Sequence, residues 1–112
     1  MIQHMVCMKF KPDVSDAEIQ RLEKLLDPLP NHIIEIQTFE FGRDVLRSER
    51  SFDFGLVSLF ANEAALQRYQ VHPEHQKVVR HIQDICVQVV TVDFLYEYKP
   101  REDIDATGLP VL

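Results

Sequence analysis

The sequence predicts a single α+β domain with a ferredoxin-like β-α-β-β-α-β order and an antiparallel sheet. Four segments alternate between their two sides with the period of a strand, and apolar residues recur at helical spacing in the stretches that connect them. The chain has 112 residues, a length that supports one core. We predict that residues 1–98 form this domain and that residues 99–112, which hold two prolines and a glycine, form a C-terminal tail.

Residues 2–10 form the first predicted strand, because His4 and its alternate neighbours share one side with large apolar residues. A helix is expected next, since Ser15 and Glu18 have the spacing of a capping box. Its apolar stripe consists of Ile19, Leu22, Leu25 and Leu26. Pro28 and Pro30 are expected to end this helix.

The middle of the chain predicts two further strands joined by a polar loop. Residues 33–42 alternate as the second strand, residues 43–51 form the loop, and residues 52–60 form the third strand. Asn62 is a suitable N-cap for a short helix over residues 63–70.

Pro73 is well suited to open another helix, because its missing N–H would be unpaired at the first helical position. This helix is expected to run to about residue 85, with an apolar stripe of Val78, Val79, Ile82 and Ile85. Residues 87–98 then form a long final strand.

The predicted strands are apolar on both faces, whereas an antiparallel sheet usually has one polar, wet face. The third strand, for example, places Phe54 and Leu56 on one side but Val57 and Leu59 on the other. The helices of one chain can cover only one face, so a second copy of the sheet is expected to cover the other, and we predict a homodimer. The alternative is a wet face that carries several apolar residues.

Composition excludes several partners. The chain has 18 acidic and 12 basic residues, a net charge of −6, and its basic residues are scattered, so no nucleic-acid partner is expected. No apolar stretch is long enough for a membrane span and no signal peptide follows Met1, so we expect no membrane partner and a cytoplasmic location. Cys7 and Cys86 lack CxxC spacing and are predicted to be buried free thiols.

Titratable side chains are densest in the segment from Tyr69 to His75, which reads Tyr-Gln-Val-His-Pro-Glu-His. With Pro73 opening a helix, His72 lies at the cap and His75 lies in the first turn, where the helix dipole disfavours a charged imidazole. A neutral His75 can accept a proton, and the phenol of Tyr69 can donate a hydrogen bond to a developing oxyanion. His4 is the third histidine of interest, because a histidine among apolar residues needs a polar partner.

The same residues have structural explanations: a helix cap for His72, a core position for Tyr69 with its hydroxyl at the rim, and a satisfied core histidine for His4. No metal site is expected, because His72 and His75 are three residues apart and the start of a helix separates them. Asp93 is either a buried acid or a residue that reaches solvent near an edge. The chain has no GxGxxG, Walker or GxSxG motif, so nucleotide binding and serine hydrolysis have no support.

Several short motifs occur together in a particular order. They are residues 4–11 (HMVCMKFK), 41–44 (FGRD), 52–57 (FDFGLV), Tyr69 with 72–75 (HPEH), and 92–94 (VDF). In this order and spacing the chain resembles the stress-responsive dimeric α/β-barrel (Dabb) family over about residues 3–96. This resemblance implies a ferredoxin-like monomer and a homodimer in which two sheets pair into an α+β barrel.

Most members of that family have no assigned activity, but at the pocket the chain resembles plant olivetolic acid cyclase. That enzyme uses a tyrosine and a histidine of the same Tyr-x-x-His-Pro-x-His segment for an aldol cyclisation without a cofactor. The resemblance implies that His75 and Tyr69 are catalytic and that His4 is a pocket histidine, and we add His72 as a second ligand-binding residue.

We therefore hypothesise cofactor-free, cyclase- or lyase-like acid–base chemistry on a small, largely apolar carbonyl compound. In this hypothesis His75 exchanges a proton with the ligand and Tyr69 stabilises its oxygen. The competing hypothesis is a non-catalytic dimer that binds a small metabolite or contributes to stress tolerance. A monooxygenase activity is a third possibility, with no specific residue behind it.

Overall fold

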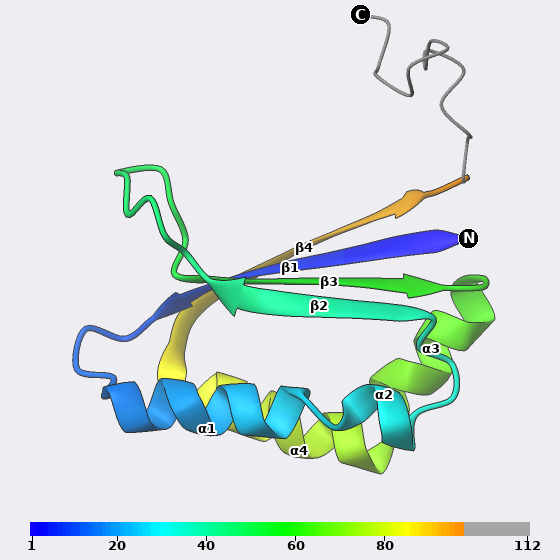
Figure 1. Ribbon diagram of the computed structural model, residues 1–112, viewed down its shortest axis with the longest axis horizontal. Helices are drawn as coiled ribbons and strands as arrows, with labels where there is room; N and C mark the ends of the chain where they lie inside the picture. The colour runs from blue at the N-terminus through cyan, green and yellow to red at the C-terminus, as the bar shows by residue number, and fades with distance from the viewer. Residues whose placement is uncertain (98–112) are drawn as a thin grey trace, which may run out of the picture.

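The computed structural model describes residues 1–97 and contains one four-stranded sheet with helices on one side (Figure 1). The strands are β1 (Ile2–Phe10), β2 (Thr38–Arg43), β3 (Phe54–Phe60) and β4 (Cys86–Leu95). All neighbouring strands are antiparallel and lie in the order β2-β3-β1-β4. The predicted tail, residues 99–112, lies outside the described residues.

Four helices connect these strands: α1 (Asp16–Leu26), α2 (Leu29–His32), α3 (Glu63–Val71) and α4 (Pro73–Ile85). The predicted caps are confirmed, since the Ser15 hydroxyl accepts a hydrogen bond from the Glu18 N–H and the Asn62 side chain accepts one from the Ala65 N–H. This arrangement is the ferredoxin-like α+β fold that the sequence predicts.

The predicted start of the second strand is wrong, because a short extra helix occupies part of that stretch. Pro30 lies in the first turn of α2, where its missing N–H costs nothing, so this proline does not end helical structure. The turn of α2 buries Ile33 completely and leaves Ile34 91% exposed. The strand therefore begins only at Thr38.

Two other strand ends differ by a few residues from the prediction. β3 starts at Phe54 rather than at residue 52, and the side chain of Asp53, just before it, accepts a hydrogen bond from the Phe10 N–H. β4 covers Cys86–Leu95, whereas residues 87–98 were expected. The split of the last helical region into α3 and α4 at His72 is as predicted.

The inner face of the sheet packs on the helices and forms the core. In β1, His4 and Met8 point to this side and are 6% and 1% exposed. They pack with inward-facing residues of β3 and with the buried stripes of α1 and α4. The fully buried members of this core include Leu22, Leu26, Phe54, Phe60, Val78 and Ile85.

The outer face of the sheet has no helices over it (Figure 1). Met5 lies directly between Val57 and Val92 in the strand register, so these three side chains share that face. They are 37%, 36% and 59% exposed, and Phe94 beside them is 44% exposed. The predicted two-faced apolar sheet is thus confirmed, and its outer face is open in the single chain.

Both cysteines are free, as predicted, but neither is fully buried. Cys7 points to the outer face, because it lies opposite Gly55 and Val90 in the register. Cys86 begins the edge strand β4, where burial is incomplete. The prediction that both are buried is wrong. Cys7 lies on an uncovered face, which the sequence pattern does not distinguish from a covered one, and Cys86 packs against the core only in part.

Candidate functional site

A cavity of about 290 Å³ lies between the inner face of the sheet and α4. Strands β1, β3 and β4 and helices α1, α3 and α4 all contribute to its wall. Most of the lining is apolar, and the polar side chains that reach it are His4, Tyr69, Gln70, His75, Gln83 and Thr91. Three of the predicted site residues, His4, Tyr69 and His75, therefore meet in one cavity.

Tyr69 reaches the cavity from the last turn of α3 and is only 2% exposed. Its ring lies against the ring of His75, with 4.1 Å between the ring centroids, and against Phe60 at 4.8 Å. Burial raises the pKa of the Tyr69 phenol well above its usual value, so the hydroxyl stays protonated at neutral pH. No hydrogen bond to this hydroxyl forms within residues 1–97, and the group can donate to a ligand in the cavity.

His75 is placed in the first turn of α4, directly after the break between the two helices. Its Nδ1 lies 3.1 Å from the backbone carbonyl of Gln70, and because a carbonyl only accepts, Nδ1 carries the proton. Burial lowers the pKa of the His75 imidazole, with smaller contributions in the same direction from His4 and His72. His75 is therefore neutral at pH 7, and its Nε2 is free to accept a proton.

His4 enters the cavity from the inner face of β1, the side required for it to join His75. Its ring lies edge-on to Tyr69, with centroids 6.3 Å apart. The Nδ1 of His4 donates a hydrogen bond to the carboxylate of Asp93, which lies directly opposite on β4. This partner fixes the tautomer of His4 and leaves only Nε2 for a ligand.

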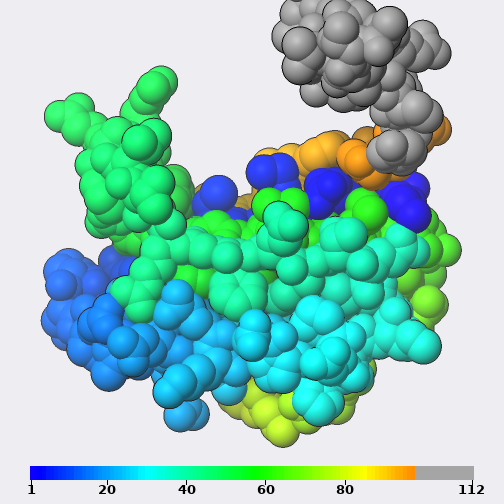
Figure 2. Space-filling model, in the orientation of Figure 1, coloured from blue at the N-terminus to red at the C-terminus, as the bar shows by residue number. Residues whose placement is uncertain are grey.

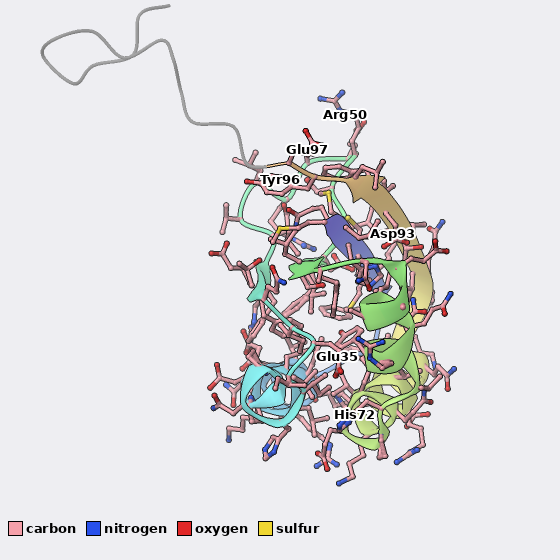
Figure 3. All side chains as sticks on the ribbon, turned by 90° about the vertical axis from the view of Figure 1, so that its right-hand side faces the viewer. Glu35, Arg50, His72, Asp93, Tyr96 and Glu97 are labelled. Atoms are coloured by element: carbon pink, nitrogen blue, oxygen red, sulfur yellow. The ribbon has the colours of Figure 1, made fainter. Side chains whose placement is uncertain are left out.

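His72 is not among the residues that line this cavity. It lies between α3 and α4, and its Nδ1 accepts a hydrogen bond of 3.1 Å from the Glu74 N–H. Figure 3 shows His72 in the helical layer, away from Asp93 on the sheet. The geometry gives His72 the capping role that was the alternative interpretation, and it provides no support for the predicted ligand contact.

Asp93 is the site residue that the sequence left unresolved between two roles. The register of β1 and β4 settles its partner, since His4 and Asp93 are directly paired, and the Asp93 side chain is still 39% exposed. The sequence does offer one sign of this contact: in the alternation of β4, Asp93 lies on the same side as Thr91, which lines the cavity. Gln83 and Thr91, also in the lining, carried no signal in the sequence.

The described residues contain no group of three or more histidine, cysteine, aspartate and glutamate side chains arranged to hold a metal ion. The titratable groups that line the cavity are the neutral imidazole of His75, the protonated phenol of Tyr69 and His4, whose ring is held by a carboxylate. These groups can accept a proton at His75 and donate a hydrogen bond from Tyr69, as general acid–base catalysis requires.

Comparison with known proteins assigns the family. The family model described as "Stress responsive A/B Barrel Domain" (Dabb) matches residues 2–96, nearly the whole described chain. The chain belongs to this family. The resemblance stated from the sequence motifs is thereby confirmed at the level of the family.

Relatives of known sequence are distant. A stress-response A/B barrel domain-containing protein of Arabidopsis thaliana is 27% identical over 103 residues, which cover 89% of this Dabb chain and 38% of that protein. A second protein of the same description and organism is 23% identical over 104 residues, covering 90% of this chain and 50% of that protein. The chain spans half or less of the length of these two relatives.

Solved structures agree on the fold. A dimeric ferredoxin-like protein of unknown function from Thermobifida fusca has a TM-score of 0.79 and 25% identity, covering 85% of this chain and 90% of that one. A hydroxynitrile lyase from Passiflora edulis has a TM-score of 0.75 at 18% identity, covering 88% and 96%. The second likeness is one of fold alone. No helix of residues 1–97 combines the length and apolar character needed to cross a membrane.

Proposed function

We propose that this Dabb domain binds a small, largely apolar carbonyl compound in the cavity under its sheet and catalyses cofactor-free proton transfer on it. The observation that carries the proposal is the contact between a neutral His75 and a protonated Tyr69 inside an apolar cavity. One group can take a proton, and the other can stabilise the negative charge that results.

The size and lining of the cavity support a small ligand. At about 290 Å³ the cavity lies just below the range of about 300–1,000 Å³ for ligand pockets, so it has room only for a small ligand. Apolar side chains from α4 and the sheet make up most of its wall, so the body of the ligand is apolar. The rings of His4 and His75 both lie beside Tyr69, with centroids 6.3 Å and 4.1 Å from that of Tyr69, and we expect the ligand oxygen to lie there.

In the minimal reaction, His75 Nε2 takes a proton from the carbon next to the carbonyl group. The electron pair of the broken C–H bond moves toward the carbonyl, and the enolate oxygen accepts a hydrogen bond from the Tyr69 hydroxyl. The His75 imidazolium then returns the proton to the carbon. Alternatively, the enolate carbon attacks a second carbonyl group of the ligand, as in an aldol cyclisation, and the alkoxide that forms takes the proton from the His75 imidazolium. The proposed reaction requires no oxidant, metal or cofactor.

The resemblance of the Tyr69–His75 segment to that of plant olivetolic acid cyclase supports this class of reaction. The hydroxynitrile lyase from Passiflora edulis is compatible with this class of reaction, because it is a lyase of similar fold. We do not propose its substrate for this chain. A single positioned acid–base pair accelerates a reaction only about 10²–10⁴-fold, so a slow enzyme is expected.

We also propose that the domain works as a homodimer whose two sheets pair into an α+β barrel. The open outer face, with Val92 59% and Phe94 44% exposed, is the support within this chain. Structures of similar fold from Thermobifida fusca and Bacteroides fragilis are described as dimeric. Closed two-fold dimers are also the commonest oligomers.

Proton exchange on small ketones and aldehydes in D₂O, followed by ¹H NMR, tests the proposed chemistry. We expect the protein to speed deuterium incorporation next to the carbonyl of those compounds that raise its Tm. His75→Ala should abolish this acceleration and Tyr69→Phe should reduce it, whereas exposed His32→Ala should keep it. A ligand that raises Tm with no accelerated exchange would instead support the non-catalytic binding dimer, and equal rates in His75→Ala and wild type would overturn the mechanism.

A further inference from the structure

The connection between β2 and β3 forms an arm, residues 44–53, that rises from the sheet on the side away from the helices (Figure 1). In the space-filling view it stands clear of the rest of the surface (Figure 2). Figure 3 shows Arg50, near its end, at the opposite extreme of the molecule from the helical layer. The arm therefore flanks the open outer face of the sheet.

Hydrogen bonds and ion pairs hold the arm at its base. The Asp44 carboxylate accepts a hydrogen bond of 2.7 Å from the Arg47 N–H, and the Asp44 N–H donates to the Asp53 carbonyl at 2.9 Å. The Arg47 guanidinium lies 2.9 Å from the Asp53 carboxylate, whose other oxygen accepts from the Phe10 N–H. Arg47 also has a positive φ of 51°, a conformation that non-glycine residues seldom adopt without such support.

The arm exposes two large aliphatic side chains to solvent. Val45 is 87% exposed and Leu46 is 83% exposed, and they are adjacent. The charged groups at the base of the arm, Asp44, Arg47 and Asp53, pair with one another. A braced loop that presents an apolar pair beside an apolar sheet face is suited to bury that pair against whatever covers the face.

The surface at the base of the arm is also hollow. A cavity of about 300 Å³ lies there, and Cys7, Gly42, Phe52 and Gly55 are in its lining. Gly42 and Gly55 are paired in the register, and a Cβ added at either glycine would meet nothing within 4 Å. This end of the outer face has room for side chains from another molecule.

We infer that the arm is a clasp for a second copy of this chain, with Val45 and Leu46 buried against the partner. This inference rests on the proposed homodimer and adds a contact outside the sheet-to-sheet interface. A second copy is the occupant that the observations favour, because the arm and the apolar outer face lie on the same side of the molecule and similar structures are dimeric. In a two-fold dimer the arm is present twice, so the same pair of side chains contributes to the interface two times.

Sedimentation of a Val45→Ser/Leu46→Ser double variant tests the clasp. We expect the dimer dissociation constant to rise about tenfold or more, since four apolar side chains lose their buried surface. Ile34→Ser is the matched control, because Ile34 is a 91% exposed aliphatic residue outside the arm, and its dissociation constant should equal that of wild type. Far-UV circular dichroism establishes that each variant is folded.

Val92→Glu, on the outer sheet face, separates the two proposals. If it produces a monomer while the arm variant remains as dimeric as wild type, the homodimer stands and the clasp is overturned. If wild type is monomeric at every concentration, both are overturned. Hydrogen exchange gives an independent measure: amides 45–48 should exchange faster in the Val92→Glu monomer than in the wild-type dimer, and equal rates would contradict the clasp.

Discussion

His4 on β1 and Asp93 on β4 face one another across the strand register, and the Asp93 carboxylate accepts a hydrogen bond from Nδ1 of the His4 imidazole. This contact ties one wall of the cavity to the edge strand of the sheet. It also explains how a histidine can sit 6% exposed among apolar side chains, since its buried polar atom has a charged acceptor.

Asp93→Asn is expected to weaken ligand binding about three- to tenfold, the value of one ordinary hydrogen bond. An asparagine side chain can donate to Nδ1 of His4 and so favour the other tautomer, which would remove the free Nε2 acceptor. The ¹⁵N chemical shifts of the His4 ring report the tautomer directly. Asp84→Asn, an exposed change on α4, is the control. Unchanged His4 shifts in Asp93→Asn would contradict this role.

His75 should make stability depend on pH in a defined direction. Burial lowers its pKa in the folded protein, while in the unfolded chain the pKa stays near the ordinary value of about 6.5. Below about pH 6.5 the unfolded state binds more protons, so the fold loses stability as pH falls toward the lowered pKa, and above pH 6.5 this effect is absent. In Tm measurements from pH 8 to pH 5, His75→Gln should lose less stability on acidification than wild type.

Exposed His32→Gln is the control for this experiment, and it should follow the wild-type curve. His4, His72 and His81 are present in all three proteins, so a difference seen with His75→Gln but not with His32→Gln is assigned to the His75 imidazole. Parallel curves for wild type and His75→Gln would show that His75 has the same pKa in both states.

His72 should act through its cap and not through a ligand. Its Nδ1 satisfies the Glu74 N–H at the start of α4, so His72→Ala is expected to cost about 0.5–2 kcal/mol of unfolding free energy, measured by urea denaturation. His72→Asn should restore most of that loss, because asparagine is a strong N-cap residue. Both variants should retain ligand affinity, and a selective loss of affinity in His72→Asn would reinstate the predicted ligand contact.

The fold could be predicted from this sequence because local signals agreed with one another. The caps at Ser15 and Asn62, the alternation in β1 and β3, and the helical stripe of α4 all pointed to one topology. The start of β2 could not be predicted from the sequence, because Pro30 is compatible both with the end of a helix and with its first turn. Only the packing of Ile33 into the core decides between the two.

The site was predictable in part. Tyr69 and His75 are close in sequence and flank one helix break, so their contact follows from local geometry. His4 and Asp93 are 89 positions apart, and their contact depends on the register of two strands, which alternation alone does not fix. The role of His72 was ambiguous for another reason, because an imidazole beside a proline can cap a helix or face a ligand.

A bulkier residue at position 79 should test whether the cavity is the place where ligands bind. Val79 lines the cavity from α4 and is only half-buried, so the extra atoms of Val79→Phe can enter empty space. We expect the variant to lose the Tm increase given by carbonyl ligands while keeping its own unfolding free energy within about 1 kcal/mol of wild type, whereas overpacking a filled core would cost about 1–3 kcal/mol. Val71→Phe, at a 74% exposed position on α3, is the matched control and should respond to ligands as wild type does. A Val79→Phe protein that still gains stability from the same ligands would place their site outside this cavity.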